Sequence, residues 1–228
     1  DADEWRRERD RIAARPRIRT SHPSRQEHPR SLETGLSLDD VAEALPDDRP
    51  WLPFEEPAAV RETAAVRGGK GRGEVLHRLM EEVLTGETEA TAASLASRAA
   101  EIEIQYRSRE GLDAPACDPD EAAGTVLRAL AVPQVAGLLG RLVPEYAAYG
   151  HGHAEDGGEM VEIGVADAVE EDGKGGVKTV VDWKSDVSPS EDVVEGYSDQ
   201  VRDYMRLLGA PRGLIVFMTA GMAVEVTP

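Results

Sequence analysis

Apolar side chains recur at helical spacing about one third of the way along the chain. Between Val75 and Leu84, six apolar residues fall at i, i+1, i+4, i+5, i+8 and i+9, which places them along one face of a helix. Gly86 marks the expected end of this helix. Further helices are predicted at 88–109, 118–131 and 133–142, and Asp118 with Pro119 provides a helix cap followed by proline at the first helical position.

The pattern then changes to shorter segments that are rich in Val and Ile. Glycine-rich turn sequences separate these segments, which is typical of a meander of strands. A second helical pattern, a continuous apolar run and a final short apolar segment follow. The predicted strands are 143–149, 159–170 and 176–184, followed by a helix at 190–208 and two strands at 213–219 and 222–226.

This order of elements predicts an α/β fold of the restriction-endonuclease-like kind. A central mixed sheet is flanked by helices on both faces, and 88–142 forms a helical insertion. Proline is dense before residue 58, so 1–67 is interpreted as an irregular connector with a short helix at 37–45; a partly disordered linker is an equal alternative. The domain proper is expected at 68–228. The first residue is Asp1 rather than Met, which suggests a piece of a longer protein.

The composition of the chain indicates what its core is made of and excludes several kinds of site. The 228 residues are 40% apolar but only 4% aromatic, so the core is expected to consist mostly of Ala, Val, Leu and Ile. The single cysteine, Cys117, excludes an internal disulfide, a zinc ribbon and a four-cysteine iron–sulfur cluster. No apolar run approaches membrane-spanning length and no signal-peptide pattern is present. We expect a cytoplasmic protein with no membrane partner.

The charge of the chain restricts how it can meet nucleic acid. The formal charge is −18, from 44 acidic and 26 basic residues. A free-standing DNA-binding module is usually basic, because neutralisation of phosphates drives its affinity. The charge therefore argues against such a module, but it is compatible with an enzyme that holds a metal ion on carboxylates and receives DNA from a partner.

The segment Val180-Val181-Asp182-Trp183-Lys184-Ser185 carries the most informative chemistry. Side chains alternate along a strand, so Asp182 and Lys184 share one face while Trp183 points to the other. Asp167 lies on the preceding predicted strand, and pairing across the 172–176 turn places the two carboxylates side by side. Adjacent carboxylates repel each other unless a cation lies between them.

Oxygen ligands of this kind favour Mg²⁺ or Mn²⁺ over zinc. A bound Mg²⁺ keeps several waters, one of which can act as the nucleophile in phosphodiester hydrolysis. Lys184 could orient that water and stabilise charge on the phosphate. The alternative is an exposed acid–lysine ladder on a half-buried strand, and an Asp-X-Lys tripeptide taken alone favours that alternative.

Four motifs occur in an order that favours a metal site over the structural acid–lysine ladder. They are Gly73-Glu74-Val75-Leu76-His77, Val165-Ala166-Asp167, Asp182-Trp183-Lys184 and Gln200-Val201-Arg202-Asp203-Tyr204. The series resembles the RecB-like nuclease family of the PD-(D/E)XK superfamily, whose members often form the C-terminal nuclease domain of UvrD-type helicase–nucleases such as the AddA and RecB proteins. The resemblance spans about residues 68 to 220.

The resemblance implies a role for each matching residue. It also implies that Mg²⁺ or Mn²⁺ is the cofactor and that DNA is delivered by a helicase domain of the same longer chain or by a helicase–nuclease partner subunit. Trp183 stands where relatives more often have Tyr, and the cysteines that hold an iron–sulfur cluster in some relatives are absent. The implied roles are metal binding for His77, Asp167, Asp182 and the backbone carbonyl of Trp183, catalysis for Asp167, Asp182 and Lys184, and contact with the DNA side for Gln200 and Tyr204.

Other polar residues have two interpretations each. Glu145 is either a further acid of the site or a structural cap of the sheet edge. The basic Gly-rich segment at 68–73 is either a DNA-strand contact through Lys70 and Arg72 or a simple flexible turn. His151 and His153 are interpreted as part of a flexible turn rather than a metal site. Arg202 and Arg206 recur at i and i+4 on the helix after the core motif, and they are candidates for a DNA-facing pair.

The leading hypothesis is therefore a Mg²⁺-dependent deoxyribonuclease domain, most simply an exonuclease acting on DNA ends in repair or recombination. One alternative is a nuclease-like scaffold that has lost catalysis and only binds DNA or a partner. Another is a metal-dependent phosphodiesterase of small nucleotides. Intact Asp167, Asp182 and Lys184 argue against the inactive scaffold, whereas the acidity of the chain favours it.

Overall fold

The computed structural model describes residues 5, 19–21, 69–111, 114–153 and 159–228. The helix expected at 37–45 and nearly all of the connector expected at 1–67 lie outside these residues, so the domain boundary stays a prediction. Within the described part of the chain, no helix is both long and apolar enough to cross a membrane.

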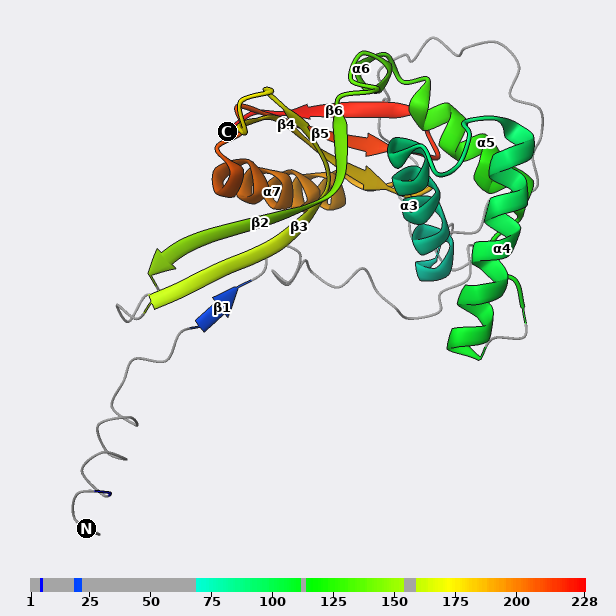
Figure 1. Cartoon of the computed structure of the whole chain (residues 1–228), viewed down its shortest axis with the longest axis horizontal. Helices are drawn as coiled ribbons and strands as arrows, with labels where there is room; N and C mark the ends of the chain where they lie inside the picture. Colours follow the sequence, from blue (N-terminus) through cyan, green and yellow to red (C-terminus); the bar gives the residue numbers. More distant parts are fainter. Residues whose placement is uncertain (1–4, 6–18, 22–68, 112–113, 154–158) are drawn as a thin grey trace, which may run out of the picture. The chain divides into compact units, whose positions relative to one another are not determined.

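The described residues form an α/β fold with a central mixed sheet, as the sequence predicts (Figure 1). Every predicted strand is present, and the helices expected at 88–109, 118–131 and 190–208 are shifted only at their ends. In chain order the elements are β1 (Arg19–Ser21), α3 (Lys70–Thr85), α4 (Ala92–Glu110), α5 (Pro119–Leu130), α6 (Pro133–Ala136), β2 (Leu142–His153), β3 (Glu159–Glu171), β4 (Val177–Lys184), α7 (Glu191–Leu208), β5 (Arg212–Phe217) and β6 (Met222–Val226).

Six strands make up the sheet, in the order β1-β3-β4-β5-β6, with β2 paired to β3 off this path. The pairs β1–β3 and β4–β5 are parallel, whereas β2–β3, β3–β4 and β5–β6 are antiparallel. Strand β1 was not predicted, because three polar residues in a proline-rich stretch have no strand-like apolar pattern. It nevertheless pairs with β3 at 160–162.

Strand β3 has an interrupted edge that matters for the site. Strand β2 pairs with 159–170 along one edge of β3. Residues 160–162 also pair with β1, and residues 168–171 also pair with β4. Both β1 and β4 therefore lie on the edge opposite β2. Among the described residues, 163–167 have no strand partner on that edge. This leaves a notch in the sheet, which opens toward the candidate site described below.

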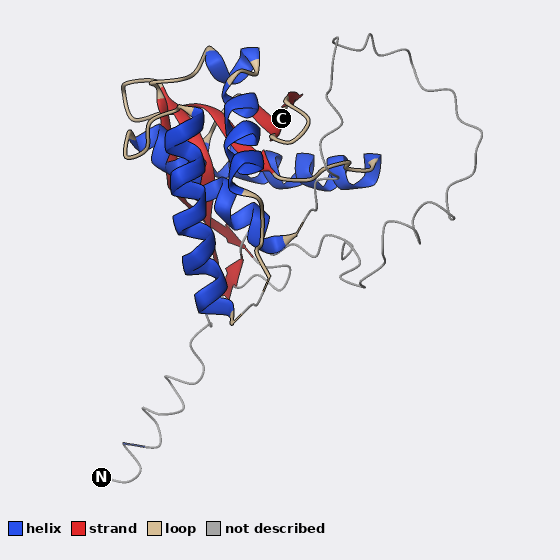
Figure 2. Cartoon of the chain, turned by 90° about the vertical axis from the view of Figure 1, so that its right-hand side faces the viewer, coloured by secondary structure: helices blue, strands red, loops and turns tan. Residues whose placement is uncertain are grey.

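Helices cover the sheet (Figure 2), and each face of the sheet has its own hydrophobic core. On one face, α3, α4, α5 and α6 pack on β4 and β5, and Trp183 is the largest buried side chain there. On the other face, α7 packs through Val201, Tyr204 and Met205. Most of the buried apolar residues are Ala, Val and Leu, as the low aromatic content predicts.

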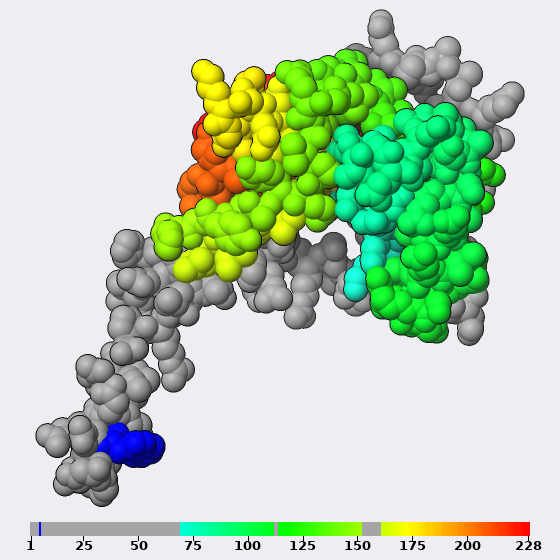
Figure 3. Space-filling model, viewed as in Figure 1, coloured from blue at the N-terminus to red at the C-terminus, as the bar shows by residue number. Residues whose placement is uncertain are grey.

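Three local predictions need correction. Helix α3 begins at Lys70, so the Gly-rich basic segment is the first turn of the helix and not a flexible turn before it. Helix α6 is only four residues long. The segment with His151 and His153 belongs to β2 rather than to a turn, because β2 continues its antiparallel pairing with β3 as far as His153. In Figure 3, β2 passes beside α3, and the β2–β3 hairpin then extends away from this helix.

Candidate active site

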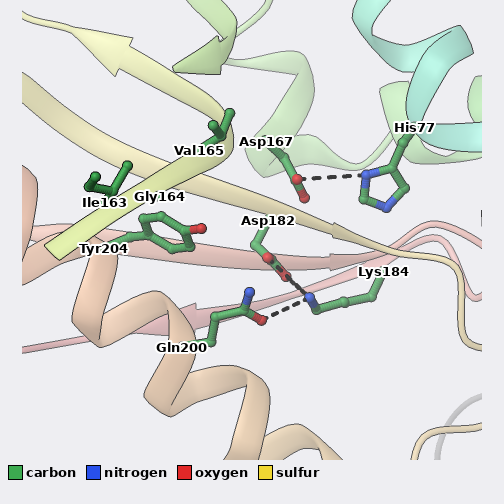
Figure 4. Close-up of a pocket in the computed structure, with 9 residues that line it drawn as sticks. All are labelled: His77, Ile163, Gly164, Val165, Asp167, Asp182, Lys184, Gln200 and Tyr204. Atoms are coloured by element: carbon green, nitrogen blue, oxygen red, sulfur yellow. Dashed lines mark hydrogen bonds and ion pairs between the residues drawn. The ribbon is translucent and has the colours of Figure 1, made fainter. Parts of the chain in front are cut away.

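One cavity of about 460 Å³ collects most of the residues singled out from the sequence. Strands β3 and β4 form its floor, and α3 and α7 contribute its sides (Figure 4). The notch in β3 lines part of it through 163–165. The other lining residues are His77, Asp167, Asp182, Lys184, Gln200 and Tyr204.

The two acids meet because the β3–β4 ladder ends next to them. The last paired residues are Ala168 and Val181, so continued pairing would place Asp167 opposite Asp182. Instead, the backbone N–H of Trp183 donates a hydrogen bond to Asp167 Oδ2 at 2.8 Å. The carboxylate thus satisfies an N–H that the ladder leaves open, and Asp167 is fixed at the point where the strands separate.

Asp182 is buried deeply beside a single cation. Only 5% of the residue is exposed. Lys184 Nζ donates a hydrogen bond to Oδ1 at 3.1 Å and lies 2.9 Å from Oδ2 without hydrogen-bond geometry. Among the described side chains, Oδ2 is the one buried oxygen or nitrogen that has no hydrogen-bond partner. Burial raises the pKa of Asp182, even though Lys184 acts in the opposite direction, so the ionised carboxylate is poorly compensated.

Helix α7 supplies two further contacts to the lysine. Gln200 Oε1 accepts a hydrogen bond from Lys184 Nζ at 3.1 Å. The ammonium also lies 4.3 Å from the centroid of the Tyr197 ring, within range of a cation–π interaction. The Tyr197 hydroxyl in turn donates to Asp186 Oδ2 at 3.0 Å. Three kinds of acceptor therefore surround one ammonium and fix its position.

His77 reaches the acids from α3. Its Nδ1 lies 3.6 Å from Asp167 Oδ1, and 35% of the side chain is exposed. Burial acts to lower the pKa of His77, but the carboxylates of Asp167 and Asp182 outweigh burial and raise it. The imidazole thus lies on the acidic side of the cavity. Trp183 lies behind the site with its ring in the opposite core.

Glu145 lies outside this cavity. It lines a neighbouring cavity of about 410 Å³ that also includes His77. The register of β2 and β3 skips Glu145, and its φ of 50° is the only positive value among the described non-glycine residues. Burial, followed by the charge of Asp167, raises the pKa of Glu145. Backbone strain of this kind is frequent next to functional sites.

The positive φ at Glu145 predicts that glycine at this position gives a more stable protein than alanine. Glycine accepts a positive φ without a steric cost, whereas alanine does not. We expect Glu145→Gly to be more stable than Glu145→Ala by about 1 kcal/mol, the reverse of the order usual in a strand. Urea unfolding monitored by circular dichroism measures both variants. An alanine variant as stable as the glycine variant would show that the left-handed conformation is not strained.

Three arginines that were considered as DNA contacts instead bind groups of this chain or lie buried. Arg206 forms a two-pronged ion pair with Glu162 of β3, and Arg202 pairs with Asp199 one turn away on α7. Arg72, considered as a DNA contact, is only 1% exposed. The cavity therefore carries one cation, Lys184, among its lining residues, together with the histidine.

Tyr197 is the residue near the site that sequence analysis missed. It stands three residues before Gln200, so both lie on one face of α7, and this spacing was a signal in the sequence. Tyr204, one turn after Gln200, is buried and lines the cavity. In the part of the chain that the structure describes, no three His, Cys, Asp or Glu side chains are arranged to hold a metal ion. Two carboxylates and an ammonium thus define the chemistry.

No family model matches this sequence. No curated protein matches it either. Solved structures do match, among them "Crystal structure of SSO0001", which is 19% identical with a TM-score of 0.35, and the match covers 70% of this chain and 78% of that chain. What this chain does is therefore inferred from its own side chains.

Proposed function

We propose that this chain is a Mg²⁺-dependent nuclease domain that hydrolyses phosphodiester bonds in DNA and belongs with the RecB-like nucleases. The convergence of Asp167, Asp182 and Lys184 in one cavity carries the proposal. An acid–lysine ladder of purely structural origin would face solvent. Here the acid is buried, one of its oxygens has no hydrogen bond, and a second carboxylate lies across the strand break.

The donor set suits a hard divalent cation. Mg²⁺ needs only one or two protein carboxylates and keeps water on its remaining positions, so Asp167 and Asp182 would suffice, with His77 and the Trp183 carbonyl as further ligands. Bound there, the ion would lower the pKa of a water and neutralise charge on the phosphate. Lys184 would donate to the reacting phosphate, and Gln200 would hold the lysine in place.

Delivery of DNA by another domain fits the charge of the chain. The net charge is −18, and the two arginines on the exposed face of α7 are occupied by acids of this chain. Affinity for the phosphate backbone must then come from elsewhere. We propose a helicase domain of the same longer protein, or a helicase–nuclease partner subunit, in a cytoplasmic setting.

Linear DNA with and without divalent ions tests the proposal. The chain is incubated with end-labelled single- and double-stranded DNA in Mg²⁺, in Mn²⁺ and in EDTA, beside Asp167→Asn and the matched control Asp199→Asn. Asp199 is an exposed acid on α7 that pairs with Arg202. We expect cleavage by the wild type and the control in Mg²⁺ or Mn²⁺ only, and none by Asp167→Asn.

Other outcomes distinguish the alternatives. DNA binding without cleavage by the wild type would favour the inactive scaffold. Hydrolysis of bis(4-nitrophenyl) phosphate but not of DNA would favour a phosphodiesterase of small nucleotides. Cleavage that persists in EDTA, or equal cleavage by Asp167→Asn, would overturn the metal site.

A further inference from the structure

Arg72 is a buried arginine that joins four parts of the fold. It lies in the first turn of α3 and is 1% exposed. Its Nε and Nη2 donate to the two carboxylate oxygens of Glu121 on α5, at 3.1 and 2.6 Å. Nη1 donates to the backbone carbonyl of Ser185 at 2.7 Å. Nη2 also lies 3.1 Å from the Thr219 hydroxyl, just beyond β5.

The Ser185 carbonyl connects this network to the site, because Ser185 directly follows Lys184. The same carbonyl accepts a hydrogen bond from the Thr219 hydroxyl at 3.1 Å. The carbonyl of Lys184 itself accepts from the backbone N–H of Met218 at 2.9 Å. The backbone at the end of β4 is thus held from α3 through Arg72 and from the end of β5.

The glycines around Arg72 allow this close contact. A Cβ on Gly73 would lie 3.1 Å from Ser185 Oγ, and a Cβ on Gly71 would lie 2.5 Å from the ring of Tyr106. The first turn of α3 therefore packs directly on the residue after Lys184. Arg72 has a packing role here, which replaces the DNA contact considered for it from the sequence.

Arg72 is well suited to fix a distance between elements. Its charge is balanced by Glu121, and the planar guanidinium makes several directed bonds at once, which a lysine cannot reproduce. Buried ion pairs contribute little net stability compared with apolar packing, but they can specify one arrangement of the elements around them. Here those elements are α3, which carries His77, and β4, which carries Asp182 and Lys184.

We propose that Arg72 is a positioning residue, which sets the separation between the His77 helix and the Lys184 end of β4 through the Ser185 carbonyl. Arg72 contacts none of the residues proposed to bind the metal. It acts by keeping the two sides of the cavity at a fixed separation. The kinetic part of this inference rests on the proposed function, whereas the structural part does not.

Arg72→Lys tests the inference, with Arg98→Lys as the matched control. Arg98 makes a similar two-pronged pair with the buried Glu82 and joins α3 to α4, but it does not contact β4. We expect Arg72→Lys to lower kcat for DNA cleavage by roughly 10²-fold with KM changed by less than about threefold. Arg98→Lys should lose comparable thermal stability and leave kcat within about twofold.

Amide hydrogen exchange of the metal-free protein gives a readout independent of activity. The N–H groups of Trp183 and Met218 report on the backbone around Lys184. We expect both to exchange at least about tenfold faster in Arg72→Lys than in Arg98→Lys, relative to the core amide of Leu79. If Arg72→Lys does not fold, Thr219→Val removes one contact to Ser185 and should show the same pattern more weakly.

The outcomes separate the inference from the proposed function. Equal exchange at Trp183 and Met218 in the two arginine variants would overturn the positioning role, whether or not the wild type cleaves DNA. Loss of kcat in both variants alike would also overturn it, since that loss would follow stability. An inactive wild type with faster exchange only in Arg72→Lys would overturn the nuclease proposal and support the positioning role.

Discussion

Replacing Lys184 by methionine is expected to lower DNA cleavage by roughly 10²–10³-fold and to tighten Mn²⁺ binding at the same time. The ammonium lies 2.9 Å from Asp182 Oδ2, so it competes with any cation for that carboxylate. Its loss removes a stabilising charge from the transition state but also removes an electrostatic competitor of the metal. Single-turnover cleavage and calorimetric titration with Mn²⁺ measure the two effects.

Lys178→Met is the matched control. Lys178 is an exposed residue on the same strand, six positions before Lys184, and both cleavage and Mn²⁺ affinity should stay unchanged in this variant. The opposite signs make the prediction specific. If Lys184 served only to hold Asp182 in place, its removal would weaken Mn²⁺ binding together with cleavage, and the catalytic role would be wrong.

Adjacency of the site residues was predictable because it follows from short-range geometry. A hairpin brings Asp167 next to Asp182 where the β3–β4 ladder ends, strand alternation puts Lys184 on the face of Asp182, and helical spacing puts Tyr204 one turn after Gln200. Each of these relations involves one element or two neighbouring ones. The structure places all five of these side chains around one cavity.

Contacts that join distant parts of the chain could not be predicted in the same way. Arg72 meets Ser185 and Thr219, which are 113 and 147 residues away, and an arginine between glycines is ordinarily typical of an exposed turn. Pairing of β1 with β3 likewise depends on the edge of β3 that β4 leaves open at 160–162. Such convergence is set by the packing of whole layers, and the local pattern contains no signal of it.

Glu145 shows a third kind of limit. The sequence placed it at the start of a strand near the site, but its left-handed backbone and its place in the adjacent cavity depend on how β2 bends past Asp167. A local distortion of this kind re-aims one side chain while the strand register stays the same on both sides of it. The sequence therefore could not decide whether Glu145 is a further acid of the site or a structural cap of the sheet edge.

Asp182→Asn is expected to stabilise the metal-free protein at pH 8 by up to about 3 kcal/mol and to have almost no effect at pH 4. Burial raises the pKa of Asp182 to about 6, and a tenfold change in a proton-binding constant corresponds to about 1.4 kcal/mol. A carboxyl with a raised folded pKa contributes full stability below its unfolded pKa and loses it as the pH rises through the folded pKa. Asparagine is neutral throughout, so the gain develops between about pH 4 and 6.

Thermal or urea unfolding in EDTA across this pH range measures the difference. Addition of Mg²⁺ at pH 8 should then stabilise the wild type but not Asp182→Asn, because a ligand that binds only the folded state adds its binding free energy to stability. Asp199→Asn, which changes an exposed acid on α7, should respond to pH and Mg²⁺ as the wild type does. A stability difference that is independent of pH would show that Asp182 is not held ionised against its environment, and it would remove the physical reason for a cation at this carboxylate.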